Sequence, residues 1–586
     1  MKVADARVRE ADGAGRVVGP GGLERTLLIA ILFAALLRLA YHVAYMEGSP
    51  FALAPITDGR ALELGARNVG AAFPLGTQPL QLVSLYPFVL GIPLSVLPWM
   101  AFVLFFQLTL AALGLWAFHR SARRLFGLRA AALSTLALML YPALAFYENK
   151  FLAVELVVLC TIGVLFTFER ALAAPRTRRF VWLGCLAGAL LLTTPAALVS
   201  VPLLFVAVAV ACRDAGRRAA PALCMVLLGL GLVLGAMATR NLHVVGRAQV
   251  LGRHALSIPI FIGNNPAANG AYNDGDRVID RGSPGGRLAL VDGLGLSEVR
   301  SHATDDAIDR ALLDRAARFV RERPRQTGAL AARKLALLSG NDEPTEHYDM
   351  HGEAAMLGGA YRLGPPFGFL AALGLLGVLL LRRGRLTPRP EGRCSPRALG
   401  WLVAALTLGP LLWMLLGFVS SPQRVPVAVP LALMSGPALL SLLRLGSRAG
   451  RPALRARRTE LTLCACVLMQ AFVPRGTPDE VGAWHHFHVG EVHERVGSFS
   501  GAVASYAQAI ASDPEEPVFL LRQARLLMVL LEMEAADAVL ARLERLDGIP
   551  SAVRRDAEAA RAKVDVVKRR WKAEGRWRGN PDPGDG

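Results

Sequence analysis

The sequence has few charged residues for its length. Of its 586 residues, 19% are Asp, Glu, Lys or Arg and 53% are hydrophobic, and the mean hydropathy is +0.39. An ordinary soluble domain carries about 25% charged residues, so this composition excludes a chain that is soluble throughout. We therefore expect a membrane protein with soluble parts attached.

Cysteine is also scarce. The long polar segments contain none, which excludes a disulfide framework in those segments. The seven cysteines fall in apolar runs or arginine-rich gaps, at positions 160, 185, 212, 224, 394, 464 and 466.

Acidic residues are outnumbered by basic ones, 46 against 65, which gives a net charge of +19. The arginines gather in short gaps between apolar runs, for example HRSARRLFGLR after residue 118 and RRGRLTPRPEGR after residue 381. Short arginine-rich loops mark the cytoplasmic side of a membrane protein. The charge therefore indicates topology, and we expect no nucleic-acid partner.

The first apolar run, residues 26–45, is long enough to cross a hydrocarbon core of about 30 Å. We interpret it as a retained span and not as a cleaved signal, with residues 1–25 forming a cytoplasmic tail. Residues 46–98 then form a first outer loop. Its end, SLYPFVLGIPLSVLP, is short and contains prolines, which predicts a juxtamembrane helix and not a further span.

Apolar length and arginine placement together predict an all-α polytopic membrane protein with about eleven transmembrane helices. Residues 26–239 would form the first transmembrane module, 240–364 an extracytoplasmic loop domain and 365–474 the last transmembrane helices. The expected crossings are 26–45, 99–118, 130–146, 151–168, 180–194, 196–212, 219–239, 365–381, 398–418, 425–443 and 459–474.

Residues 475–575 have the pattern of an extracytoplasmic, tetratricopeptide-like helical repeat domain, followed by a disordered tail at 576–586. A second repeat over 517–550 is degenerate, and a helix at 551–572 would cap the stack. Such a domain is either a plain helical hairpin or a surface that binds a protein acceptor or partner. The signature residues of the first repeat are Gly490, Gly497, Ala502, Tyr506, Ala509 and Pro514.

The first outer loop begins with PITDGRALELGA, which contains a single aspartate, Asp58. A helix here would stack Asp58, Leu62 and Ala66 on one face and pair Glu63 with Arg67 on another. Read alone, the segment is more typical of a solvated connector, because a single aspartate in a polar loop is common.

The surrounding motifs change that interpretation. The stretch from Pro55 through Leu85-Tyr86-Pro87 resembles the first outer loop of GT-C glycosyltransferases of the protein mannosyltransferase and aminoarabinose transferase type. FYENKFLAVE, LLTTPAALVSVP, RNLHVVG with IGNNPAANGAY, and SPQRVPVAVPLALM continue the resemblance in order, over most of residues 25–445. The chain departs from the family pattern at Leu62, where an aromatic residue is expected, and at Gly59, where many members carry an acid.

The resemblance implies a membrane enzyme that transfers a sugar from a polyprenyl-phosphate lipid to an acceptor protein, lipid or surface glycan on the extracytoplasmic side. An inverting mechanism needs a base that takes the proton of the acceptor hydroxyl, and Asp58 is the candidate. The departing phosphate needs cations, for which Lys150, Arg240 and Arg424 lie at the predicted outer face. The alternative for each cation is an interfacial anchor.

Further cavity residues are predicted. Tyr86 and Glu148 belong to the family motifs, and Glu155 is an intramembrane acid expected to face a site or a structural partner. The resemblance places Asn264 and Asn265 near the cavity, although a tight turn explains the same sequence.

A metal cofactor is left open. Some GT-C enzymes bind a divalent ion beside the catalytic acid, and Glu343, His347 and His351 have a partial metal-ligand spacing. Pro344 and Gly352 interrupt any helix there, which favours a surface loop.

Two other classes of function remain as alternatives. A transporter should show internal inverted repeats, of which none is convincing here. A non-catalytic scaffold, in which the repeats recruit partners, is kept open by Leu62 and Gly59. In each case we expect a multi-pass protein of the inner (plasma) membrane with a cytoplasmic N-terminus.

Overall fold

The computed structural model describes residues 20–78, 85–97, 99–251, 254–272, 305–346, 348–388, 394–445, 458–473, 480–547, 549 and 551–574. Within these ranges the chain is helical, and its only β feature is an isolated bridge between Ala271 and Val419. The predicted all-α class is confirmed.

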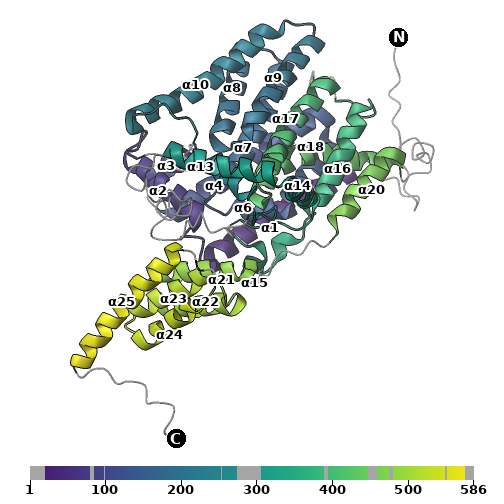
Figure 1. Cartoon of the computed structure of the whole chain (residues 1–586). Coiled ribbons are helices and arrows are strands. Elements are labelled where there is room, and N and C mark those ends of the chain that lie inside the picture. Colours follow the sequence, from purple (N-terminus) through teal and green to yellow (C-terminus); the bar gives the residue numbers. More distant parts are fainter. Residues whose placement is uncertain are drawn as a thin grey trace, which may run out of the picture.

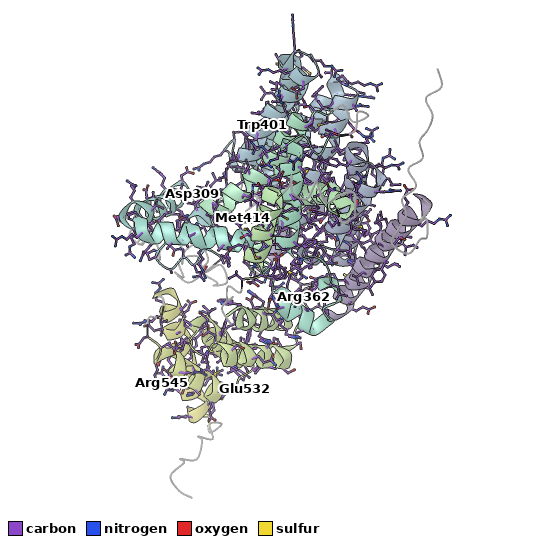
Figure 2. All side chains as sticks on the ribbon, turned by 90° about the vertical axis from the view of Figure 1, so that its right-hand side faces the viewer. Asp309, Arg362, Trp401, Met414, Glu532 and Arg545 are labelled. Carbon is purple, nitrogen blue, oxygen red and sulfur yellow. The ribbon has the colours of Figure 1, made fainter. Side chains whose placement is uncertain are left out.

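Seven of the described helices are long and apolar enough to cross a membrane, which confirms a multi-pass architecture (Figure 1). Figure 2 shows Trp401 and Met414 at successive heights along this bundle. The seven helices are α1 (Pro20–Gly48), α4 (Met100–Phe126), α7 (Val154–Ala173), α9 (Ala197–Asp214), α10 (Ala219–Val245), α17 (Pro396–Leu416) and α18 (Ser421–Leu445).

The other four expected crossings correspond to shorter helices. The crossing predicted as one span at 130–146 is wrong in detail, because α5 ends at Met139 and α6 (Pro142–Tyr147) begins after a gap of two residues. Pro142 lacks an N–H and keeps the residue before it out of the helical region, so the chain breaks there. The shorter helices are α5 (Leu128–Met139), α8 (Thr177–Thr193), α16 (Phe367–Arg382) and α20 (Arg458–Ala471).

Glycines allow α8 and α10 to pack closely. A Cβ on Gly184 would lie 2.0 Å from the carbonyl oxygen of Val226, and a Cβ on Gly229 would lie 2.0 Å from that of Val181. Only glycine permits this mutual approach of two backbones, as is common between membrane helices.

The first outer loop folds into two packed helices, α2 (Thr57–Ala71) and α3 (Tyr86–Val96). A Cβ on Gly91 would lie 2.7 Å from a methyl group of Val69, so the two helices cross at close range. α3 has 11 residues, too few to span a membrane, and this agrees with the short helix predicted from its prolines.

The segment between α10 and α16 contains four further described helices and one short 3₁₀ turn. Its residues 273–304, which belong to the predicted outer domain, lie outside the described part of the chain. The elements are α11 (Ser257–Ile262), α13 (Asp305–Glu322), α14 (Pro324–Ser339), α15 (Met350–Leu357) and η2 (Ala360–Arg362).

The C-terminal segment forms a helical domain with its own core, in yellow-green and yellow in Figure 1. Gly490 packs against the ring of Tyr506, where a Cβ would lie 2.5 Å from the ring, and Ala502 and Ala509 are fully buried. The assignment as a tetratricopeptide repeat stays a prediction. The helices are α21 (Glu480–Arg495), α22 (Phe499–Ser512), α23 (Pro517–Val529), α24 (Met533–Glu544) and α25 (Ser551–Ala573).

The two ends of the bundle differ in charge. At one end Arg124 pairs with Glu169 at 3.2 Å, and Arg383 and Arg385 pair with Glu460 at 2.8 and 2.9 Å. The other end carries α2, α3 and α15, and the C-terminal helices lie against it, with Arg362 between them and the bundle in Figure 2. α4 joins the two ends, since its last turn contains Arg124 and its first turn follows α3.

Candidate functional site

Asp58 lies in the first turn of α2 and is half-buried. The exposed N–H groups and the dipole of a helix N-terminus favour a negative charge at this position. The residue before it, Thr57, has a positive φ of 44° and a buried hydroxyl that finds no hydrogen-bond partner in the described structure. A β-branched residue in this conformation is strained, so the backbone just before Asp58 is held against its own preference.

Tyr348 packs against this first turn. Its hydroxyl accepts a hydrogen bond of 3.2 Å from the N–H of Ile56, the N-cap residue of α2. Its ring is buried and contacts Phe51 edge-on at 5.6 Å. Burial raises the pKa of Tyr348 above its usual range, and the charges of Glu353 and Asp58 act in the same direction.

Close packing accounts for the departure from the family pattern at Gly59. A Cβ on Gly59 would lie 2.9 Å from the Tyr348 hydroxyl and 3.0 Å from the carbonyl oxygen of Phe151, so no acidic side chain fits there. At the other departure, Leu62 is 3% exposed and belongs to the main hydrophobic core.

Lys150 is fully buried and paired. Its ammonium group donates to both carboxylate oxygens of Glu353, at 2.8 and 2.7 Å, and lies 3.8 Å from the ring centre of Tyr45. Burial lowers the pKa of Lys150 to about 8, although Glu353 acts in the opposite direction. The pair joins the turn at 148–151 to α15.

Arg240 holds the chain that follows α2. Its guanidinium donates to the carbonyl oxygens of Leu75 at 2.8 Å and Gln78 at 2.7 Å, and to the side chain of Asn241 at 2.8 Å.

Arg424 holds the loop at residues 340–343 in the same way, through backbone carbonyl groups. It is fully buried and donates to the carbonyl oxygens of Asp342 at 2.6 Å and Gly340 at 2.7 Å. Its guanidinium also lies 3.7 Å from the carboxylate of Glu343 and 4.1 Å from the ring centre of Phe367. Each of the three predicted phosphate ligands thus already has partners within the protein.

Tyr86 is linked to the turn at 148–151. Its hydroxyl donates to Gln107 at 3.0 Å, and the Gln107 amide donates to the carbonyl oxygens of Glu148 at 3.0 Å and Lys150 at 2.9 Å. The structure thereby brings three of the predicted site residues into one buried network.

Glu148 and Glu155 share a cation that the sequence analysis missed. Arg38 of α1 forms an ion pair with Glu148, donates 2.8 Å to the carbonyl oxygen of Met139, and interacts electrostatically with Glu155. Glu155 is 4% exposed, so this intramembrane acid faces protein, as expected.

Asn264 and Asn265 form a turn against the end of α17. The Asn264 amide donates to the carbonyl oxygens of Ile260 at 2.8 Å and Leu416 at 2.6 Å, and the Asn265 amide donates to that of Phe261 at 3.0 Å. These amides build the turn, as the alternative interpretation of this sequence proposed.

The partial metal-ligand spacing has a structural explanation. The Glu343 carboxylate accepts hydrogen bonds from Tyr141 at 2.8 Å and Ser421 at 2.6 Å, and the backbone N–H of His351 donates to the Asp349 carboxylate at the start of α15. His347 lies outside the described residues. Among the residues that are described, no group of three or more His, Cys, Asp or Glu is placed to hold a metal ion.

The C-terminal domain contacts the segment just before Asp58 and the helix α15. Arg495, at the end of α21, donates a 2.8 Å hydrogen bond to the carbonyl oxygen of Pro55. The His485 ring fills the space beside Gly352, where a Cβ would lie 2.7 Å from it, and contacts Phe51 edge-on at 5.7 Å. No local motif signals these contacts, because their partners are hundreds of residues apart in the sequence.

A groove of about 840 Å³ lies between the apolar helices α1, α4 and α5. Its walls are mainly apolar, and Arg38 and Glu148 are among the few charged residues that line it. Because Glu148 belongs to the turn whose Phe151 carbonyl approaches Gly59, this turn borders both the groove and the start of α2. Apolar lining residues include Leu28, Ala35, Leu108, Ala112 and Ala132.

The fold and this buried charged cluster define a polytopic helical membrane protein with a polar site at one end of its bundle. No family model matches the sequence. No curated protein matches it either.

Several solved structures are similar to it. The apo oligosaccharyltransferase of Archaeoglobus fulgidus is 15% identical over 76% of this chain and 54% of its own, with a TM-score of 0.41. AglB from the same organism, in complex with an inhibitory peptide and a dolichol-phosphate, is 12% identical over 79% and 58%, with a TM-score of 0.36. ArnT from Cupriavidus metallidurans bound to undecaprenyl phosphate is 16% identical over 72% and 78%, with a TM-score of 0.31.

This chain spans only about half the length of the archaeal oligosaccharyltransferase. These TM-scores are below 0.5, so the functional proposal rests on the residues of this chain.

Proposed function

We propose that this chain is a membrane glycosyltransferase that moves a sugar from a polyprenyl-phosphate lipid to an acceptor on the extracytoplasmic side. The observation that carries the proposal is the placement of Asp58. This half-buried carboxylate lies at a helix N-terminus, after a strained residue, at the end of the bundle away from the arginines. Perturbed groups and strained backbone gather at functional sites more than elsewhere.

The proposed reaction is an inverting transfer. The acceptor oxygen attacks the anomeric carbon, the bond from that carbon to the lipid phosphate breaks, and the acceptor proton passes to the Asp58 carboxylate. The lipid phosphate leaves with the bonding electron pair. A general base must be close to the acceptor hydroxyl, and the position of Asp58 in the first turn of α2 leaves its carboxylate partly exposed for this contact.

The cations have positioning roles in this proposal. Lys150 holds the turn at 148–151, Arg240 holds residues 75–78, and Arg424 holds the loop at 340–343. Direct binding of the donor phosphate by these three residues stays a prediction, and it would require at least one of them to exchange its present partners.

The groove between α1, α4 and α5 suits the hydrocarbon part of the donor. A polyprenyl chain needs an apolar channel at membrane depth, and a volume of about 840 Å³ is adequate for an extended part of such a chain. Glu148 lines the groove and belongs to the turn that contacts the start of α2, so a donor whose phosphate lies at this turn would bring its sugar toward Asp58.

The arginine-rich end gives the proposed orientation. If it is cytoplasmic, the N-terminus is cytoplasmic, and α2, α15 and the C-terminal domain face outward from the inner membrane. The acceptor, whether protein, lipid or surface glycan, would then arrive from outside, with the C-terminal domain as a possible binding surface.

Donor consumption tests the proposal. The purified full-length protein in lipid vesicles is offered a panel of radiolabelled polyprenyl-phosphate sugars with acceptor extracts, and wild type is compared with Asp58→Asn. Asp306→Asn is the matched control, because Asp306 is a largely exposed acid on α13 that pairs only with Arg247 in the described contacts.

We expect wild type and Asp306→Asn to consume one donor and Asp58→Asn to lose that activity. Equal consumption by all three would exclude Asp58 as the base. No consumption with any donor and acceptor would favour the scaffold alternative.

A further inference from the structure

The C-terminal helical domain is built into the end of the bundle that carries Asp58. Val492 of α21 is 2% exposed and belongs to the main core of the membrane bundle, with Val489 packed against the same core. On the other side of α21, Phe487 belongs to the core of the C-terminal domain. One helix therefore joins two hydrophobic cores, and this fixes the position of its last residue, Arg495.

Arg495 reaches the chain just before Asp58. Its guanidinium donates 2.8 Å to the Pro55 carbonyl oxygen, across a sequence separation of 440 residues. The next peptide group is also held, because the Ile56 N–H donates to the Tyr348 hydroxyl at 3.2 Å. Two long-range contacts thus fix two successive residues of the chain.

The residue that follows these two contacts is the strained one. Thr57 has a φ of 44°, a conformation that is unfavourable for a β-branched residue. Such a conformation persists only where the surroundings hold it, and Arg495 and Tyr348 provide that restraint immediately upstream. The φ of Thr57 sets the direction in which α2 starts and therefore where the Asp58 carboxylate lies.

We propose that Arg495 is a positioning residue for Asp58, and that the docked C-terminal domain is therefore part of the transfer site. The inference rests on the proposed function, with Asp58 as the base. Arg495 acts through Pro55 and Thr57 and need not touch the substrate. The domain then does more than offer a surface to partners, because it holds the start of the catalytic helix.

The test uses the full-length protein in lipid vesicles with four variants: Arg495→Met, Arg495→Lys, Thr57→Gly and the double variant Arg495→Met/Thr57→Gly. Glycine adopts a positive φ without strain, so the double variant should keep the start of α2 without the arginine. Arg525→Met is the control, since Arg525 pairs with Asp556 inside the C-terminal domain at 2.8 Å.

We expect Arg495→Met to lower kcat five- to tenfold with KM for the donor nearly unchanged, since a misplaced base affects the chemical step. Arg495→Lys should retain most of the activity, and the double variant should recover at least half of the loss. A purely structural role would not be rescued by Thr57→Gly. Wild-type kcat in Arg495→Met, or no recovery in the double variant, would overturn the inference.

A second measurement tests this inference independently of the proposed function. Hydrogen exchange of the backbone amides in residues 56–62 needs no substrate and reports the opening of the first turn of α2. Faster exchange in Arg495→Met, with wild-type exchange in Arg525→Met, supports the positioning role even if wild type transfers no sugar. Equal exchange in all three proteins would contradict it.

Discussion

The Lys150–Glu353 pair is the most buried ion pair of the site, with side chains 0% and 1% exposed. Removing one partner leaves a charge buried without compensation, which costs about 3–5 kcal/mol. We expect Lys150→Met to lower the free energy of unfolding by that amount and Lys150→Met/Glu353→Leu to recover more than half of it. Denaturant titration of the detergent-solubilised protein measures both.

The exposed pair of Arg67 and Glu63 on α2 is the control for this prediction. Surface pairs contribute about 0–1 kcal/mol, so Arg67→Met should have little effect on unfolding. A Lys150→Met protein as stable as wild type would show that the buried pair is not formed.

Gly59 is a second position with a testable packing constraint, because the structure leaves no room there for a Cβ atom. Gly59→Ala places a Cβ 2.9 Å from the Tyr348 hydroxyl and 3.0 Å from the backbone of Phe151, and the carbonyl cannot easily move. We expect a loss of about 1–3 kcal/mol in unfolding free energy, together with reduced transfer activity. Thermal unfolding and donor consumption are measured on the same sample.

Gly235→Ala is the matched control for Gly59→Ala. A Cβ on this helical glycine meets nothing within 4 Å, so alanine should be neutral or slightly stabilising there. Gly59→Ala with unchanged Tm and activity would contradict the packing of Tyr348 against α2.

At the scale of single residues, the sequence indicates which side chains are candidates for a site better than it indicates which residues contact them. Asp58 is recognisable because an acid follows a long apolar run in a family-like motif. Its neighbours Tyr348 and Arg495 are not, because they come from segments about 290 and 440 residues away and have no characteristic spacing. The sequence singles out Lys150, Arg240 and Arg424 as candidate phosphate ligands but does not reveal that protein groups already bind them.

The docking of α21 should depend on pH through His485. This ring is 6% exposed, and burial lowers its pKa to about 4 from the usual 6.5. Asp349 raises the pKa, whereas Lys150, His486 and His488 lower it. The undocked ring binds a proton below pH 6.5 and the docked ring does not, so docking loses stability as the pH falls from about 6.5 to about 4.

The expected loss is roughly 1.4 kcal/mol per pH unit within that window. His485→Phe should remove most of the dependence, because phenylalanine keeps the ring beside Gly352 and cannot be protonated. Limited proteolysis between α20 and α21 as a function of pH measures docking. An unchanged pH profile in His485→Phe would exclude this residue as the cause.

The groove gives a prediction for α1, α4 and α5 together. Ala112→Trp would fill part of the cavity of about 840 Å³ without touching Asp58 or the C-terminal domain. We expect KM for a long-chain donor to rise several-fold while kcat with a short, water-soluble donor analogue stays unchanged. Leu113→Trp is the control, because Leu113 is 55% exposed on the same helix and does not line the groove.

The ends of a helix can be predicted from the sequence where a single local feature, such as a proline, determines them. The short helix α3 was predicted from its prolines, whereas the span expected at 130–146 is divided into α5 and α6. The mean hydropathy of this segment stays high across Pro142, so it does not predict the break between α5 and α6. The close crossing of α8 with α10 depends on Gly184 and Gly229, and that of α2 with α3 depends on Gly91 against Val69. The sequence does not show which of these residues face each other.

At the scale of the whole molecule, the arginine–glutamate pairs of α4 and α16 and the first turn of α2 lie at opposite ends of the bundle. The arginine-rich ends of α4, α7 and α16 lie at one end, and α2, α15 and α21 meet at the other. The sequence alone predicts this polarity because short arginine-rich gaps alternate with apolar runs. It does not predict that the C-terminal domain docks onto the site, since that contact involves side chains remote in the chain.

The central claim, that Asp58 is the base of an inverting transfer, is tested most directly by single-turnover kinetics with the donor identified by the panel. We predict that Asp58→Asn binds this donor as tightly as wild type but transfers the sugar at least about a hundredfold more slowly, and that the wild-type product has the inverted anomeric configuration. Transfer by Asp58→Asn at the wild-type rate, or a product with retained configuration, would contradict the account.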